Sequence, residues 1–315
     1  MNRSLINAAR KAAGTTHLAT SSQIEQLRAD IECAKRLAAQ NLVLHIKEKG
    51  VLPSIRDAEF RVSSQFGDDG IIQYLIHILQ IKPETFIEFG VENYVESNTR
   101  FLLINNNWRG LIIDGSSDNI DYIRSDYISW RHDLTAIRSF ITAEQIDQIF
   151  TSNGFEGDIG ILSIDIDGVD WHIWKSISTI NPVVVIVEYN SIFGSKAAVT
   201  VPYNPSFVRS EAHYSNLYYG ASLRAFCILA EEKGYALVGC TSAGQNAYFV
   251  RKDALGPLAP LTSEEAFIAG KFRESRSKQG KLTFMSGHAK AQEIADMPIL
   301  DVELARNITV GDLLL

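Results

Sequence analysis

The residues of this sequence best suited to chemistry are five acids, each of which ends or directly follows a short apolar run. They are Glu88, Asp114, Asp165, Asp167 and Glu188. The apolar runs alternate with helical patterns, which predicts a doubly wound, Rossmann-like α/β fold with a mostly parallel sheet. Parallel strands share one carboxyl edge, so the five acids are expected together where such sheets bind their ligands. Any one of them alone is more typical of a helix cap or a surface position.

The stretch from Thr85 to Ser97 reads T-F-I-E-F-G-V-E-N-Y-V-E-S and predicts a strand, a tight turn and the approach to a helix. Gly90 allows the backbone of this turn to come close to a ligand. A dinucleotide site requires G-x-G-x-x-G, whereas this stretch has a single glycine and three acids, Glu88, Glu92 and Glu96, which would repel a diphosphate. S-adenosylmethionine carries a sulfonium, an ammonium and a ribose but no phosphate, and it tolerates such acids. The alternative is a buried strand with a polar turn and no ligand.

A second group of acids is expected at the ends of two later strands. Asp165-x-Asp167-Gly168 ends one strand, and Glu188 ends its neighbour. Converging there, the carboxylates would hold a hard divalent ion such as Mg²⁺ or Mn²⁺ through oxygen ligands. The alternative is one buried acid and one helix cap. His172, five residues after Asp167, is a candidate general base because its ordinary pKa lies near neutrality, although a helix surface role is more common.

Composition restricts the function classes. The chain has 315 residues, which fits one large α/β domain with appendages. Its formal net charge of −7 argues against general nucleic-acid binding, which needs a basic surface. Three cysteines without metal-binding spacing favour a reducing, cytoplasmic location. No run approaches eighteen apolar residues, so no membrane span is expected, and the N-terminus has no apolar segment typical of a signal peptide.

The N-terminal part, residues 1–60, is expected to be a helical extension. A helix is predicted from Ser22 to Lys49, with apolar residues such as Ile24, Leu27 and Ile31 along one face. This face has no obvious place in a doubly wound sheet. We expect it either to pack on the domain or to form a homodimer with a second copy.

The remaining chain is expected to form one α/β domain over residues 61–255 and a helical or irregular C-terminal extension over 256–315. A long aromatic insert at about residues 189–220 interrupts the β-α rhythm and suits a polar ring such as a sugar, or packs on itself. An antiparallel edge pair is predicted at residues 235–240 and 246–251. Two further predictions are a weak third strand at residues 127–133 and a helix at residues 263–278.

Several segments resemble class I S-adenosylmethionine-dependent methyltransferases. F-I-E-F-G-V-E-N-Y-V-E-S-N-T and N-W-R-G-L-I-I-D-G are similar to the first two motifs of that class. I-L-S-I-D-I-D-G-V-D-W-H-I-W, V-V-V-I-V-E-Y-N and S-Q-F-G-D-D-G-I-I resemble segments of its FkbM-like group. The first motif departs from the usual form at Val91 and Asn93, where small residues are common. The resemblance covers about residues 63–251.

The resemblance implies methyl transfer to a hydroxyl, often on a sugar, a secondary metabolite or a cell-surface glycan. It implies that acids at the ends of the fourth and fifth strands face this small-molecule or glycan acceptor. It also implies a cofactor site, in which the acid of the second strand would take the ribose diol. That site is expected to comprise Gln65, Glu88, Gly90, Glu92, Asp114 and Gly115.

Two other function classes stay open at this level. Asp165-x-Asp167 is also typical of a metal-dependent glycosyl transferase, although the first loop supplies only acids around a diphosphate. A non-catalytic ligand-binding protein of the same fold is the second alternative.

Overall fold

The computed structural model of the chain describes residues 21–314, which divide into two units between Asn41 and Leu42. Helix α2 (Ser21–Lys49) makes up the described part of the first unit and continues into the second. The helix predicted from Ser22 to Lys49 is therefore confirmed. The first twenty residues of the predicted N-terminal extension lie outside the described residues. Among the described helices, none combines the length and the apolar character that a membrane crossing requires.

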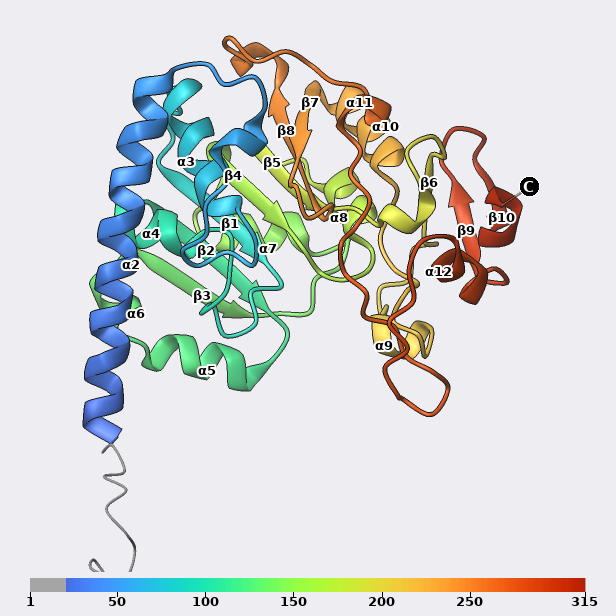
Figure 1. Ribbon diagram of the computed structural model, residues 1–315, viewed down its shortest axis with the longest axis horizontal. Helices are drawn as coiled ribbons and strands as arrows, with labels where there is room; N and C mark the ends of the chain where they lie inside the picture. Colours follow the sequence, from blue (N-terminus) through green and yellow to red (C-terminus); the bar gives the residue numbers. More distant parts are fainter. Residues whose placement is uncertain (1–20, 315) are drawn as a thin grey trace, which may run out of the picture. The chain divides into compact units, whose positions relative to one another are not determined.

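The second unit is built on a seven-stranded, mostly parallel sheet (Figure 1). Its strand order is β3-β2-β1-β4-β5-β8-β7, and β8 runs antiparallel to both of its neighbours. The predicted Rossmann-like fold and its antiparallel edge pair are therefore confirmed. The strands are β1 (Thr85–Phe89), β2 (Arg109–Asp114), β3 (Leu134–Arg138), β4 (Gly157–Ile164), β5 (Ile180–Glu188), β7 (Tyr235–Cys240) and β8 (Asn246–Arg251).

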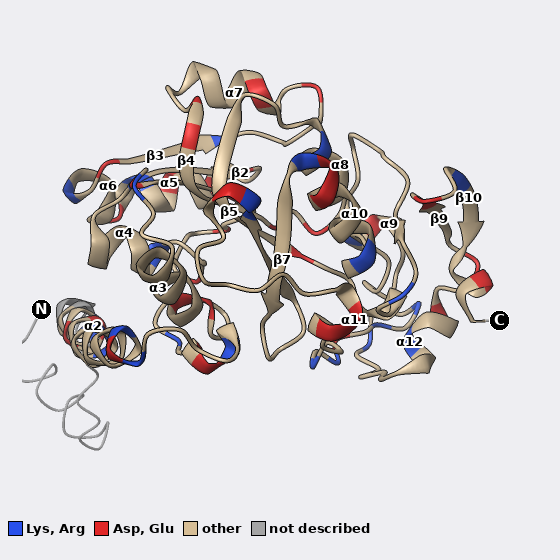
Figure 2. Ribbon diagram, turned by 90° about the horizontal axis from the view of Figure 1, so that it is seen from above, with Lys and Arg blue, Asp and Glu red and all other residues tan. Residues whose placement is uncertain are grey.

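Helices cover both faces of this sheet, because its strands are apolar on both sides. In β5, Val184 and Ile186 pack in one core, while Val185 and Val187 pack in the other, as the alternation of strand side chains requires. Figure 2 shows the long strands mostly free of charged residues, which lie mainly on helices and loops. The first core is closed by α3 (Asp68–Ile78), α4 (Arg100–Asn106), α5 (Ser117–Ser125) and α6 (Ile128–Arg131), and the second by α7 (Ile146–Ser152), α8 (Asp170–Ser176) and α10 (Leu223–Lys233).

A second, three-stranded sheet joins the insert after β5 to the C-terminal end of the chain (Figure 1). Its order is β10-β9-β6, so a short strand of the insert pairs with a strand about 100 residues later. These C-terminal strands were not predicted. The elements of this region are β6 (Val199–Thr200), α9 (Arg209–Ala212), α11 (Ser263–Ala266), α12 (His288–Glu293), β9 (Pro298–Asp301) and β10 (Arg306–Thr309).

Two local predictions were wrong. The third strand does not lie at residues 127–133, where α6 forms instead, but begins at Leu134. This strand pairs only with β2 and is half exposed, so it carries little of the apolar signal of a buried strand. The helix predicted at residues 263–278 ends at Ala266. Beyond Ala266 the backbone forms hydrogen bonds with residues distant in sequence. For example, the Lys271 amide donates to the Ala243 carbonyl at 2.9 Å.

Candidate functional site

A cavity of about 500 Å³ opens at the carboxyl ends of the parallel strands. It lies where β1 has β2 on one side and β4 on the other, which is the point where open α/β sheets bind ligands. Its walls contain nine of the ten residues predicted for the site. They are Gln65, Glu88, Gly90, Glu92, Asp114, Gly115, Asp165, Asp167 and Glu188.

Glu88 ends β1 and is almost completely buried. Its Oε1 atom accepts a hydrogen bond from the Asn98 amide at 2.8 Å. Its Oε2 atom accepts from the amide and the hydroxyl of Thr99, at 3.0 and 2.5 Å. Burial raises the pKa of Glu88 to about 7, even though these hydrogen bonds favour the charged form. Glu88 thus fixes the segment that leads into α4, in addition to lining the cavity.

Asp114 ends β2 at the same edge of the sheet. Its Oδ1 atom accepts hydrogen bonds from the Ser116 amide at 2.8 Å and from the Asn119 side chain at 3.1 Å. Its other oxygen accepts none from the described residues, and Asp114 lines the cavity together with Phe140. Phe140 is 53% exposed, so its ring is accessible from the cavity.

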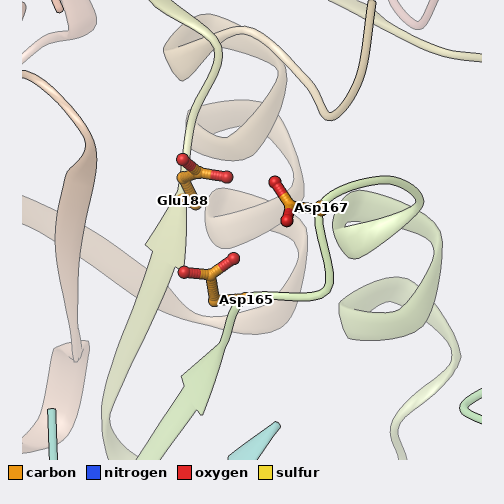
Figure 3. A group of neighbouring side chains, drawn as sticks. All are labelled: Asp165, Asp167 and Glu188. Atoms are coloured by element: carbon orange, nitrogen blue, oxygen red, sulfur yellow. The ribbon is translucent and has the colours of Figure 1, made fainter. Parts of the chain in front are cut away.

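Three carboxylates, those of Asp165, Asp167 and Glu188, converge beyond the ends of β4 and β5 (Figure 3). One oxygen from each lies within 4.8 Å of the others. The turn that makes this convergence possible is held by Asp170, whose side chain accepts from the amides of Ile166 and Gly168 at 2.9 and 3.0 Å. Asp167 itself has a positive φ of 54°, a backbone conformation that residues other than glycine adopt infrequently.

The negative charge of this carboxylate cluster, which consists of Asp165, Asp167 and Glu188, is poorly balanced by the described residues around it. The side-chain carboxylates of Asp165 and Glu188 accept no hydrogen bond from the described residues, and Glu188 is only 8% exposed. Burial, followed by the repulsion of neighbouring carboxylates, raises the pKa of both groups well above their ordinary values. A set of oxygen ligands with excess negative charge fits a hard divalent ion.

Arg209 is the cation in contact with this cluster. It belongs to α9 of the insert, and its guanidinium forms an ion pair with the Asp167 carboxylate. Its Nε atom donates to the Asn216 carbonyl at 2.8 Å. The guanidinium carbon lies 3.7 Å from the centre of the Tyr219 ring, within cation–π range. Arg209 is therefore held by one residue of the cluster and by two residues of the insert.

His172 is the predicted site residue that the structure does not bring to the cavity. Its Nε2 atom lies 2.9 Å from the Val201 carbonyl, and its ring packs between Trp171 and Tyr203. Burial lowers its pKa, so the neutral ring that bonds a carbonyl is favoured. This placement gives His172 a packing role beside β6 rather than contact with the carboxylates.

The tyrosines of the insert divide into two groups. Tyr203 and Tyr218 use their hydroxyls for internal contacts, at 2.7 Å from a Glu144 carboxylate oxygen and 2.5 Å from the Pro298 carbonyl. Tyr189 and Tyr219 line the cavity, although the Tyr189 hydroxyl also donates to the Ile268 carbonyl at 2.6 Å. The insert is therefore both a packing element and a wall of the site.

No family model matches the sequence, and no curated protein sequence matches it. Solved structures with a similar fold are S-adenosylmethionine-dependent methyltransferases. An O-methyltransferase from Bacillus cereus, in complex with S-adenosylhomocysteine (SAH), is 15% identical over 77% of this chain and 95% of its own, with a TM-score of 0.39. A methyltransferase from Clostridium acetobutylicum is 10% identical over 58% of this chain and 89% of its own, with a TM-score of 0.38.

A geranyl diphosphate C-methyltransferase from Streptomyces coelicolor, in complex with Mg²⁺, geranyl diphosphate and SAH, is 13% identical. It covers 54% of this chain and 62% of its own, with a TM-score of 0.35. The first of these proteins is named an O-methyltransferase and the last a C-methyltransferase, and the likeness concerns the fold alone.

Among the cavity-wall residues that sequence patterns did not indicate, four are Phe140, Arg209, Phe272 and Lys290. Phe140 and Arg209 lie in segments without clear periodicity, and Phe272 and Lys290 belong to the C-terminal extension. The only available signal was that Arg209 is the one Lys or Arg between Lys196 and Arg224, in a region rich in tyrosine. Its pairing with Asp167, 42 residues away, depends on the folded insert.

Proposed function

We propose that the chain is an S-adenosylmethionine-dependent methyltransferase that methylates a hydroxyl of a sugar, a secondary metabolite or a cell-surface glycan. One observation carries this proposal. A single cavity joins the acid-ended strands β1 and β2 to the carboxylate cluster beyond β4 and β5. In this proposal the β1 and β2 side of the cavity binds the cofactor and the carboxylate side binds the acceptor, because a direct transfer requires two bound molecules side by side. Membership of the FkbM-like group is part of the proposal and rests on the sequence motifs.

The residues of the β1 and β2 side fit the cofactor. Asp114 offers a free carboxylate oxygen to ribose hydroxyls, and the exposed ring of Phe140 offers a face for stacking a base. Gly90 and Gly115 leave backbone accessible, and Glu92 places negative charge near a cationic ligand. Gln65 completes this wall. When bound, S-adenosylmethionine supplies a methyl group on a positively charged sulfur.

The acceptor half contains the groups that would handle a proton. Asp167 and Glu188 are the candidate general bases for the acceptor hydroxyl, and Asp165 lies beside both of them. Burial makes Glu188 a stronger base than an exposed carboxylate, because it raises the pKa of that group well above its ordinary value. The wall formed by Tyr219, Leu217 and Phe207 is suited to one face of a sugar ring.

A divalent ion is the alternative means of activating the hydroxyl. The carboxylate cluster of Asp165, Asp167 and Glu188 would hold it, and the ion would lower the pKa of the hydroxyl. Removal of metal with a chelator separates the two routes. Loss of turnover, restored by Mg²⁺ or Mn²⁺, supports the ion, and unchanged turnover supports a carboxylate base.

Ligand binding tests the proposal before an acceptor is known. The purified chain is titrated with SAH by calorimetry, and its thermal unfolding is followed with SAH, with a sugar nucleotide plus Mn²⁺, and with neither. Binding and thermal stabilisation by SAH alone are expected. A folded sample that is stabilised only by the sugar nucleotide plus Mn²⁺ would indicate a glycosyl transferase instead.

We further propose that α2 forms a homodimer in the cytoplasm. Its residues Ile24, Leu27, Ile31 and Leu37 are large, apolar and exposed, and the first three follow each other at spacings of three and four residues, as in helices that pair with a second copy. The three cysteines are free thiols, consistent with a reducing compartment. Light scattering of the double variant Leu27→Glu, Ile31→Glu should give half the mass of the parent, and a monomeric parent would contradict the homodimer.

A further inference from the structure

The carboxylate cluster has an unbalanced charge that the fold leaves in place. Its three carboxylates meet one guanidinium, that of Arg209, among the described residues. Glu188 is the decisive member, since the residue is more than nine-tenths buried and its carboxylate, which accepts no hydrogen bond from the described residues, points into the cluster (Figure 3). A buried, unpartnered carboxylate is costly unless a cation completes its site. A second positive charge, in addition to that of Arg209, would therefore stabilise the cluster.

Arg209 already forms an ion pair with one member of the cluster, Asp167. Its side chain is 25% exposed, whereas that of its partner Asp167 is 56% exposed. Asp167 is thus the most accessible ligand of the cluster and the one already neutralised. The other two contacts of Arg209, with the Asn216 carbonyl and the Tyr219 ring, are both to residues of the insert. Arg209 would keep these contacts if it released Asp167.

We propose that Arg209 is a tethered cation that competes with a divalent ion for Asp167, so that Arg209 sets the affinity of the carboxylate cluster for metal. This inference deepens the proposed function and rests on its metal route. Two cations drawn to one small group of carboxylates repel each other, so binding the ion weakens the Arg209–Asp167 pair. The pair is weak enough to be displaced, since ion pairs with a solvent-exposed partner such as Asp167 contribute little to stability.

The competition has a structural consequence for the acceptor wall. Tyr219 lines the cavity and carries the Arg209 guanidinium on its ring. Release of Asp167 leaves Arg209 attached to Tyr219 and Asn216 alone, which loosens α9 from the turn that follows β4. Binding of the ion would thereby be coupled to the mobility of the insert beside the acceptor.

Metal affinity measured without any acceptor tests this role. Mn²⁺ is titrated into the full chain by calorimetry or by electron paramagnetic resonance, for the parent, Arg209→Met and Arg209→Lys. Arg209→Met should bind Mn²⁺ about fivefold more tightly, because the competing ion pair is gone. Arg209→Lys keeps the charge and should bind like the parent. Arg224→Met is the matched control, since Arg224 forms an ion pair with Glu303 away from the cavity.

The direction of the change decides between two roles of Arg209. Weaker Mn²⁺ binding by Arg209→Met would overturn the proposal, because it would make Arg209 a support for Asp167 rather than its competitor. Hydrogen exchange of residues 208–216 gives an independent measure, and Mn²⁺ should speed exchange there in the parent. Absence of Mn²⁺ binding by all variants, in samples that bind SAH, would refute this inference while leaving methyl transfer intact. Absence of SAH binding would instead refute the proposed function.

Discussion

Gly90 lies directly against the main-chain carbonyl oxygen of Asp165, so that a Cβ atom at position 90 would be 1.7 Å from this oxygen. Gly90 also has a positive φ of 66°, and its amide donates to the Ile113 carbonyl at 3.0 Å. The turn after β1 is therefore packed between the end of β2 and the end of β4. Glycine is required here for contact between the two halves of the cavity, in addition to any close approach of a ligand.

Replacing this glycine should be costly. Gly90→Ala combines a backbone clash with an unfavourable φ, and we expect it to lower the free energy of unfolding by about 3 kcal/mol or more. Gly115→Ala is the matched control in the same cavity, because its Cβ atom would meet only a Phe140 ring carbon at 3.9 Å. Urea unfolding of both variants measures the difference. Equal stabilities would show that the turn can move away from Asp165.

Glu88 should make the stability of the protein depend on pH in an unusual direction. Its pKa is raised from 4.5 to about 7 by burial, so the folded state binds a proton more tightly than the unfolded state. The associated stability is complete below pH 4.5 and is lost as the pH rises through 7. Asp170, whose pKa burial raises to about 6, acts in the same direction. The free energy of unfolding should therefore fall between pH 5 and pH 8, by up to about 3 kcal/mol from Glu88.

Glu88→Gln tests the assignment of this pH dependence. The variant loses the ionisation and should have a flatter stability profile between pH 5 and pH 7.5, measured by urea unfolding at each pH. It should also be less stable at pH 5, since both Glu88 oxygens accept hydrogen bonds and an amide nitrogen can accept none. An unchanged slope would assign the effect to other buried acids.

The gathering of acids at one sheet edge was predictable from sequence because it follows from strand direction alone. Each acid ends an apolar run, and parallel strands bring their carboxyl ends together. What each acid contacts was not predictable in the same way. Glu88 is engaged by the amides of Asn98 and Thr99, which depends on the path of the turn between them. The local sequence pattern therefore predicted the position of Glu88 at the sheet edge, but it did not predict the hydrogen bonds of this residue.

The remaining differences arise from long-range contacts. Arg209 reaches Asp167 only because the insert folds back over the sheet, and β9 is paired with β6 across about 100 residues. His172 follows the carboxylates closely in sequence, but its position in α8 points its ring to the Val201 carbonyl. Separation in sequence is a poor guide to such contacts where helical or strand periodicity is absent.

Asp114 should contribute directly to cofactor affinity. Asp114→Ala removes the charge-assisted hydrogen bonds expected with ribose hydroxyls and should weaken SAH binding by about 1–3 kcal/mol, measured by calorimetry. Asp118→Ala is the matched control, because Asp118 lies in the first turn of α5 and does not line the cavity. Similar losses in both variants would indicate a change in α5 rather than a lost ligand contact.

The chemistry should depend on the carboxylate cluster, whichever route activates the hydroxyl. Asp167→Asn and Glu188→Gln keep the shape of the side chains but remove a base and a charged oxygen ligand. We expect each to reduce turnover by about 100-fold and to leave SAH affinity nearly unchanged, because the cluster lies on the acceptor side of the cavity.

Turnover is followed as SAH release with a panel of hydroxylated sugars and metabolites as acceptors. Glu211→Gln, an exposed acid of α9 outside the cavity wall, is the control and should retain the parent rate. Full activity of both cluster variants, with an acceptor that the parent methylates, would show that the reacting hydroxyl does not bind next to these carboxylates. The role of Asp114 in cofactor binding would be unaffected by that result, since cofactor binding does not depend on where the acceptor lies.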